Sequence, residues 1–197
     1  NVEYADVMQR MANEGAQVIY SGDIAQAIVD TVRGAKSNPG MISLTDLSTY
    51  KVKERPAVCA PFREHQVCGM GPPSSGALTV GQILGLLDRF PVGSKNDPQT
   101  LRLIGDASRL AFADRGRYMA DSDFVPMPTK GLVSADYLSE RAKLLTGSRA
   151  LTDVLPGNPK HSHASLWADD VSLELPSTSH ISIADSYGNA LSMTTTI

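Results

Sequence analysis

The last twenty residues alternate between polar and apolar side chains, and no other feature of the sequence constrains the fold as strongly. Residues 180–184 read His-Ile-Ser-Ile-Ala, and residues 190–197 alternate in the same way. A period of two is typical of a β-strand with one buried face. The residues between the two runs, Ser186-Tyr187-Gly188-Asn189, are turn formers. The sequence therefore predicts a β-hairpin in this part of the chain.

The register of this hairpin decides which hydroxyl groups meet at its open end. A four-residue loop over 186–189 places Thr178 opposite Ile197 and Ser179 opposite Thr196. A one-residue bulge instead places Thr196 directly opposite Thr178. Because threonine is common in strands, the proximity of two hydroxyl residues is by itself more typical of an ordinary strand than of a reactive site.

Most of the remaining chain has helical patterns. Apolar residues recur at helical spacing between capping residues and glycines, and the predicted helices cover 2–14, 22–33, 44–50, 77–88, 98–119 and 135–145. Two short strands are expected at 52–60 and 65–70. Residues 121–130 are expected to be irregular, and residues 147–176 to form a long surface segment. Together these patterns predict a helix-rich α+β fold.

The two cysteines lie on the predicted strand pair. A two-residue loop at Arg63-Glu64 places Cys59 opposite Cys68. There they form either a disulfide or a pair of small buried apolar side chains, and the sequence leaves both open. Neither cysteine belongs to a C-x-x-C motif or to a His/Cys cluster, so a metal site is not expected.

Other polar clusters are expected to have no chemical role. His161 and His163 have no third ligand nearby, so we expect no metal there. Asp169-Asp170 is expected to be a solvated pair of charges. Asp114-Arg115, on the predicted long helix, is expected to be an ion pair at the surface or at a helix end.

Composition and charge exclude several classes of protein. The 197 residues include 18 Lys+Arg and 21 Asp+Glu, a net charge of −3, so no basic surface for nucleic acid is expected. The longest apolar stretch, 77–87, is shorter than the roughly 20 residues that span a bilayer. Motifs of P-loops, dinucleotide-binding folds, serine hydrolase elbows and zinc proteases are missing. The chain begins at Asn1 and stops within a strand-like run at Ile197, so we expect a fragment of a longer protein.

Several stretches resemble the γ-glutamyltranspeptidase family and occur in that family's order. Residues 178–185, Thr-Ser-His-Ile-Ser-Ile-Ala-Asp, with Gly188-Asn189-Ala190 and Thr194-Thr195-Thr196, are similar to the start of its small subunit. Residues 70–76, Met-Gly-Pro-Pro-Ser-Ser-Gly, and 111–115, Ala-Phe-Ala-Asp-Arg, resemble stretches of its large subunit. The resemblance covers nearly the whole chain.

The resemblance implies part of the αββα sandwich of N-terminal-nucleophile hydrolases. Members of this family are made as one precursor that cuts itself before a threonine, and the matching bond here is Ser177–Thr178. Thr178 then becomes the nucleophile. Its freed α-amine, with an unperturbed pKa of about 7.7–8.0, can act as the base that a threonine hydroxyl needs. Thr196 matches a second threonine, whose hydroxyl bonds this amine.

The resemblance also divides the chain. Residues 1–177 correspond to the C-terminal part of the large subunit, with a short hairpin near 52–70, and residues 178–197 to the first hairpin of the small subunit. The chain is thus expected to be one fragmentary domain overall. The family residues that bind the α-carboxylate and form the oxyanion hole lie outside it, so the chain alone is expected to be inactive and uncut. Three further matching residues are expected to be structural: His180, Ser182 and Asp185.

The function implied for the whole protein is transfer or hydrolysis of the γ-glutamyl group of glutathione and related amides. It proceeds through an ester on Thr178 and needs no cofactor or metal. One alternative is a related acylase of the same family, such as a cephalosporin acylase or a poly-γ-glutamate depolymerase. Another is a homologue without activity that fails to cut itself. The resemblance further implies a periplasmic or extracellular protein whose partners are the two subunits of one precursor.

Overall fold

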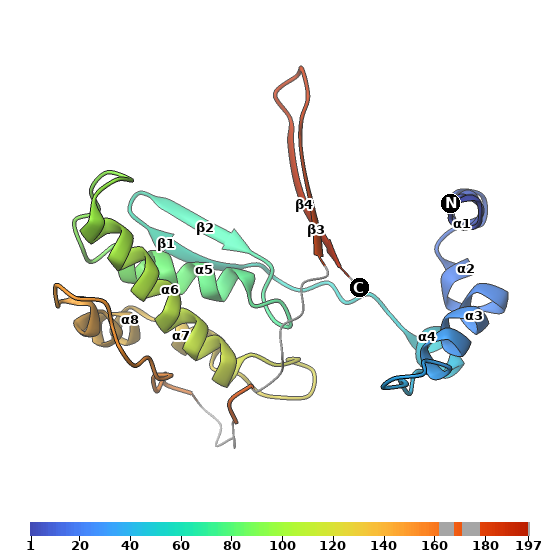
Figure 1. Cartoon of the computed structure of the whole chain (residues 1–197), viewed down its shortest axis with the longest axis horizontal. Helices are drawn as coiled ribbons and strands as arrows, with labels where there is room; N and C mark the ends of the chain where they lie inside the picture. Colours follow the sequence, from blue (N-terminus) through green and yellow to red (C-terminus); the bar gives the residue numbers. More distant parts are fainter. Residues whose placement is uncertain (162–167, 171–177, 197) are drawn as a thin grey trace. The chain divides into compact units, whose positions relative to one another are not determined.

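The computed structural model of the chain describes residues 1–161, 168–170 and 178–196. The chain divides into two compact units, Asn1–Glu54 and Arg55–Ile197 (Figure 1). Each unit has its own helices and its own buried side chains. The boundary expected after residue 177 concerns a covalent cut, so this division of contacts does not test it.

The first unit is built from helices whose starts are explained by capping. The helices are α1 (Val2–Glu14), α2 (Gln17–Tyr20), α3 (Gly22–Arg33) and α4 (Leu44–Thr49). The Asn1 side chain accepts a hydrogen bond from the Tyr4 amide at 2.9 Å, and Ser43 forms a capping box with Asp46. These contacts confirm three predicted helices to within one residue. Helix α2 was not predicted, because a single turn is too short to show a period.

The second unit combines two β-hairpins with helices. Its strands are β1 (Val58–Phe62), β2 (His65–Gly69), β3 (Thr178–Ala184) and β4 (Ala190–Thr196). Its helices are α5 (Gly76–Leu87), α6 (Pro98–Tyr118), α7 (Thr129–Leu132) and α8 (Ala135–Ala142), followed by the 3-10 turn η1 (Lys143–Leu145). The predicted helix-rich α+β class is confirmed. Helix α7 was not predicted, because this single turn directly follows Pro128 in a stretch expected to be irregular.

Helix α5 lies at the centre of the core of this unit because two glycines allow close neighbours. A Cβ atom at Gly81 would lie 2.8 Å from the Ala60 side chain of β1. A Cβ atom at Gly85 would lie 2.6 Å from the Leu138 side chain of α8. Figure 1 shows the β1–β2 hairpin and α6 beside this helix. Leucines of α5 and α6 fill the interior between these elements: Leu78, Leu86, Leu103 and Leu110.

The β1–β2 hairpin has the predicted register. Phe62 pairs with His65 around the two-residue loop, and Cys59 pairs with Cys68. The two cysteines form a disulfide with a Cα–Cα distance of 4.0 Å, so the first of the two alternatives holds. Strand β1 starts at Val58, later than the expected residue 52, because Pro56 has no N–H to contribute to a ladder.

The β3–β4 hairpin is confirmed; of its two predicted registers, the one with Thr196 opposite Thr178 is observed, and the one with a four-residue loop is wrong. Ala184 pairs with Ala190, and Thr178 pairs with Thr196. The Asp185 amide bonds the Asn189 carbonyl at 3.1 Å, so the loop holds the three residues 186–188 instead of four. Gly188, with a φ of 86°, supplies the left-handed conformation with which such three-residue loops end.

The segment after η1 packs on the helices, so the expected surface segment over 147–176 is wrong for its first part. Leu151 and Val154 contact the core cluster, and Pro159 is fully buried. Backbone amides and carbonyls of this segment form hydrogen bonds with side chains of α6 and α8. The polar composition of the segment does not indicate these bonds, because they are made by its backbone. Beyond residue 161, the structure describes only 168–170 of this segment.

Candidate active site

The open end of the β3–β4 hairpin holds the two predicted reactive threonines. Thr178 pairs with Thr196 in the register, and Cα atoms of directly paired residues typically lie about 4.5–5.5 Å apart. Thr178 is exposed. Ser177, the other residue of the predicted cleavage site, lies outside the described residues. The register thus makes the two threonines neighbours, and their chemical roles stay predictions.

The pair formed by Thr178 and Thr196 has no backbone hydrogen bonds of its own. Hydrogen-bonded and non-hydrogen-bonded pairs alternate along an antiparallel ladder. The Asp185–Asn189 pair is hydrogen-bonded, so the alternation makes Ser179–Thr195 a bonded pair and Thr178–Thr196 an unbonded one. Unbonded pairs have the shorter Cα separation, about 4.5 Å. The two threonines therefore lie close together, but the backbone hydrogen bonds nearest to them belong to the Ser179–Thr195 pair.

His180 joins hydroxyl groups of both strands next to this pair. Its Nδ1 lies 2.9 Å from Thr194 Oγ1, and its Nε2 lies 3.1 Å from both Ser182 Oγ and Ser192 Oγ. Alternation places all of these residues on the same face of the hairpin as Thr178. From the sequence, His180 is expected to be only a structural strand residue. One feature of the sequence indicates these contacts: a polar residue occupies every second position from Thr178 to Ser182.

The loop of this hairpin is closed by one carboxylate. Asp185 Oδ1 accepts from the Tyr187 and Asn189 amides, each at 2.9 Å. Its Oδ2 accepts from Asn189 Nδ2 at 2.9 Å. These hydrogen bonds, first of all those from Asn189, lower the pKa of Asp185 below its usual value. The charged form of Asp185 therefore stabilises the loop that sets the register.

A second cluster surrounds Asp114 of α6, which is 1% exposed. Its Oδ2 accepts from Gln82 Nε2 at 2.7 Å and from the Tyr137 hydroxyl at 2.6 Å. Its Oδ1 accepts from the Gly157 amide at 2.7 Å and from Arg141 Nη2 at 3.3 Å. The expected surface or helix-end ion pair with the next residue is wrong, because this face of α6 is covered by α5, α8 and the segment around Gly157.

The two tyrosines of this cluster act as hydrogen-bond donors. Burial raises the pKa of Tyr137, and its hydrogen bond to Asp114 raises it further. Burial also raises the pKa of Tyr118, whose hydroxyl donates to the Gly157 carbonyl at 2.6 Å. Both hydroxyls therefore stay protonated. We assign this cluster a structural role, because its polar groups, apart from the buried Arg141 Nε, bind one another and the backbone.

The two stretches that resemble the large subunit meet in space. Arg115 at the end of the 111–115 stretch donates from Nε to Ser75 Oγ of the 70–76 stretch at 3.1 Å. The Arg115 guanidinium also lies over the Phe112 ring, 5.6 Å from its centroid. The contact fixes the turn before α5 against the last turns of α6.

Residues 168–170, which precede the predicted cleavage site, are bound to the end of α6. Arg117 forms an ion pair with Asp169. Its Nε contacts Oδ1, and its Nη2 lies 2.9 Å from Oδ2. The Asp170 amide donates to the Gly116 carbonyl at 2.8 Å. The hydrogen bond to Arg117 lowers the pKa of Asp169. Asp169 and Asp170 are exposed, as expected, and Asp169 in addition forms an ion pair with Arg117.

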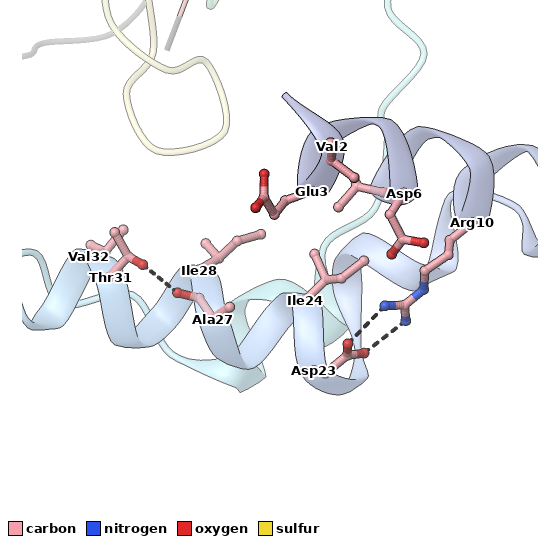
Figure 2. Close-up of a pocket in the computed structure, with 11 residues that line it drawn as sticks. Val2, Glu3, Asp6, Arg10, Asp23, Ile24, Ala27, Ile28, Thr31 and Val32 are labelled. Atoms are coloured by element: carbon pink, nitrogen blue, oxygen red, sulfur yellow. Dashed lines mark hydrogen bonds and ion pairs between the residues drawn. The ribbon is translucent and has the colours of Figure 1, made fainter.

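A groove in the first unit is the other concave surface of note. It lies between α1 and α3, and Figure 2 shows Val2, Ile24 and Ile28 along it. At one end Arg10 binds both carboxylate oxygens of Asp23, at 2.8 and 2.9 Å. The groove is lined mainly by apolar side chains, and Arg10 and Asp23 neutralise each other's charge. We therefore assign no catalytic role to it.

Within 1–161, 168–170 and 178–196 no three His, Cys, Asp or Glu side chains gather as a metal site would require. His161 Nδ1 lies 3.1 Å from the Pro159 carbonyl oxygen, and His163 lies outside the described residues. None of the helices described is both long enough and apolar enough to cross a membrane.

The whole chain, residues 1–197, matches the family model for gamma-glutamyltranspeptidase. The chain belongs to the gamma-glutamyltranspeptidase family. The acylase ACY 1 proenzyme of Pseudomonas sp. (strain SE83) is 31% identical over 198 residues, which cover 99% of this chain and 32% of the relative. The glutathione hydrolase proenzyme of Escherichia coli (strain K12) is 30% identical over 199 residues, which cover 98% of this chain and 32% of the relative. The chain thus spans about a third of the length of these relatives.

Solved structures of gamma-glutamyltranspeptidase relatives have the same fold. The gamma-glutamyltranspeptidase of Helicobacter pylori superposes with a TM-score of 0.71 at 28% identity, over 80% of this chain and 45% of that one. The cephalosporin acylase of Bacillus halodurans superposes with a TM-score of 0.69 at 25% identity, over 79% of this chain and 28% of that one. These matches confirm the predicted fold class, a helix-rich α+β piece of the N-terminal-nucleophile hydrolase sandwich.

Proposed function

We propose that Thr178 is the nucleophile of an enzyme that transfers or hydrolyses γ-glutamyl groups, and that it is released by a cut at Ser177–Thr178. The observation that carries this proposal is the register, in which Thr178 is the cross-strand partner of Thr196. Membership of the gamma-glutamyltranspeptidase family supports the reaction class. Thr196 is proposed to bond the amine of Thr178 and to hold it toward the hydroxyl.

The proposed self-cleavage needs no outside reagent except water. Thr178 Oγ attacks the Ser177 carbonyl carbon and loses its proton, while the C–N bond breaks and the nitrogen gains a proton. The resulting ester is hydrolysed by water. The products are a carboxylate on Ser177 and a free α-amine on Thr178. In the uncut chain this nitrogen is an amide and cannot accept a proton near neutral pH, so the cut creates the base.

The proposed turnover repeats the same attack on a γ-glutamyl amide such as glutathione. The Thr178 amine takes the proton of its hydroxyl, and Oγ forms an ester with the γ-carbonyl carbon. The amine of the substrate leaves with a proton. Water or a second amine then attacks the ester, which gives hydrolysis or transfer. We propose that residues outside this chain supply the carboxylate-binding and oxyanion contacts, so the 197 residues alone should not turn over substrate.

The test is the Thr178→Ala variant of the full-length protein. It should be neither cut nor active, because no hydroxyl remains to form either ester. Cleavage is read by intact mass, and activity by release of glutamate from glutathione. The matched control is Ser179→Ala, which removes a hydroxyl from the next residue on the opposite face and should leave cleavage and turnover intact. Normal turnover by Thr178→Ala would disprove the proposal.

A related acylase is the second candidate. An acylase proenzyme is as similar to this chain as a glutathione hydrolase proenzyme is, at 31% and 30% identity. The nucleophile would be the same, and only the acyl pocket outside this chain would differ. Parallel assays of the full-length protein on glutathione, on cephalosporin side-chain amides and on poly-γ-glutamate distinguish these substrates. Absence of a cut in the wild-type protein would favour the inactive homologue.

We further propose that the protein works in the periplasm or outside the cell, with the large and small subunits of one precursor as partners. The Cys59–Cys68 disulfide supports this location, because disulfides persist mainly in oxidising compartments. Fractionation of cells that express the full-length gene, followed by thiol labelling, tests both the location and the oxidised state.

A further inference from the structure

The imidazole of His180 links β3 and β4 on the face that carries Thr178. It contacts Thr194 directly across the hairpin, and it contacts Ser182 and Ser192, which pair with each other two positions further inward. In either neutral tautomer one ring nitrogen donates and the other accepts. Hydroxyls do both, and each ring nitrogen offers one such site, so Nδ1 can bond Thr194 while Nε2 bonds Ser182 or Ser192. The ring therefore ties both strands together two pairs away from the Thr178–Thr196 pair, with the Ser179–Thr195 pair between them.

This position matters because the proposed cut turns Thr178 into a chain end. Terminal residues of strands fray unless other contacts hold them. The Thr178–Thr196 pair has no backbone hydrogen bonds of its own, so among the described residues the Ser179–Thr195 pair on its inner side is the nearest backbone-bonded pair that can hold it after the cut. Before the cut, the covalent bond to Ser177 limits the same motion.

We propose that His180 is a positioning residue for the nucleophile: through Thr194 it pins the newly formed terminus of β3 to β4 and so keeps Thr178 beside Thr196. The inference rests on the proposed function and adds a residue to it. It also gives a reason for the hydroxyl residues at alternate positions of both strands. Each of Ser182, Ser192 and Thr194 presents an oxygen to the same ring.

The proposal predicts that turnover and self-cleavage respond differently to loss of the ring. In the full-length protein, His180→Leu keeps a side chain of similar size and removes every hydrogen bond. Misplacement of a reacting group by about 1 Å lowers rates by up to about a hundredfold. We therefore expect kcat to fall between about tenfold and a hundredfold with KM nearly unchanged, while self-cleavage goes to completion. A residue needed only for folding would lower both activities together.

Rescue and coupling sharpen the test. An amide oxygen of His180→Asn lies near the position of Nδ1, so this variant should keep the bond to Thr194 and recover most of the lost kcat. Thr194→Val removes the partner hydroxyl and should lower kcat about as much as His180→Leu, and the double variant should be no worse than either. Ser179→Ala, on the opposite face, is the matched control and should keep wild-type kcat.

Hydrogen exchange provides a readout independent of substrate. In the cut form, His180→Leu should speed exchange of the amides in 179–182, whereas in the uncut precursor it should change them little. Wild-type kcat in both His180→Leu and Thr194→Val, with Thr178→Ala inactive, would overturn this inference and leave the proposed function standing. Activity in Thr178→Ala would overturn the proposed function itself. If His180→Leu does not fold, Thr194→Val and its double variant with His180→Asn still decide the matter.

Discussion

Replacing Asp114 by alanine is expected to destabilise the second unit severely, because donors from separate elements converge on this one carboxylate. Gln82, Tyr137, Arg141 and the Gly157 amide all donate to it, at distances from 2.6 to 3.3 Å. The Arg141 side chain is 10% exposed, so removal of its partner leaves a buried charge unmatched. Breaking a buried ion pair in this way costs about 3–5 kcal/mol. We expect Asp114→Ala to lower the free energy of unfolding by this amount.

The isosteric Asp114→Asn variant should lose less. Its remaining oxygen can still accept from the Gly157 amide, while the Gln82 amide can turn over and the Tyr137 hydroxyl can rotate to accept from the new NH2 group. Only the charge opposite Arg141 has no substitute. The loss of one charged hydrogen bond is worth about 1.5–3 kcal/mol, so the asparagine variant should lie between wild type and alanine.

Urea unfolding of the full-length protein, followed by far-UV circular dichroism, measures these differences. Hydrogen exchange at the Gly157 amide adds a local readout, since its acceptor is the substituted group. Glu140→Ala is the control, because this exposed carboxylate of α8 contacts only Lys143 among the residues described, and its loss should not change the unfolding midpoint measurably. If Asp114→Ala unfolds at the wild-type midpoint, the enclosed carboxylate contributes no stability and the reasoning fails.

Three further predictions concern other parts of the chain. Gly157→Ala should destabilise by about 1–3 kcal/mol in the same urea assay, because a Cβ there would lie 2.2 Å from the Tyr137 hydroxyl; an unchanged midpoint would contradict it. Cys59→Ser removes a cross-link that closes a ten-residue loop and stabilises the fold by about 2.7 kcal/mol through chain entropy. Reductant should lower the unfolding midpoint of the wild-type protein and leave that of the variant unchanged. The α6 cap Asp97 has a lowered pKa because it accepts from Thr100, so its stabilisation relative to Asp97→Ala should be complete above about pH 4 and disappear as the pH falls through the lowered pKa; a difference independent of pH down to pH 2 would refute this.

Much of the fold could be predicted because its signals are local. The start of α6 follows from Asp97, whose side chain accepts from the Thr100 amide at 2.9 Å, and from Pro98 at the first helical position. The Cys59–Cys68 pairing follows from a two-residue loop. In each case the residues that fix the structure lie within ten positions of one another, and the pattern of types shows them.

The rest depended on geometry that a pattern does not contain. The sequence leaves two β3–β4 registers open because the left-handed conformation of Gly188 shortens the loop, and glycine type alone does not reveal its φ. Burial of Asp114 depends on which face of α6 meets α8, a question of packing between elements far apart in sequence. The contacts of His180 with Ser192 and Thr194 follow from the corrected register, so they could be found only after it.

The number of residues in the β3–β4 loop determines which residue lies opposite Thr178. Surface loops ordinarily tolerate inserted and deleted residues. In this hairpin one extra residue beside Tyr187 that shifts the register by one would place the residue before or after Thr196 opposite Thr178. The Thr196 side chain would then lie on the other face. Such an insertion would separate Thr178 from Thr196 although both residues remain in the sequence. Homologues of this protein should therefore vary freely in which residues occupy 186–187 while keeping their number constant.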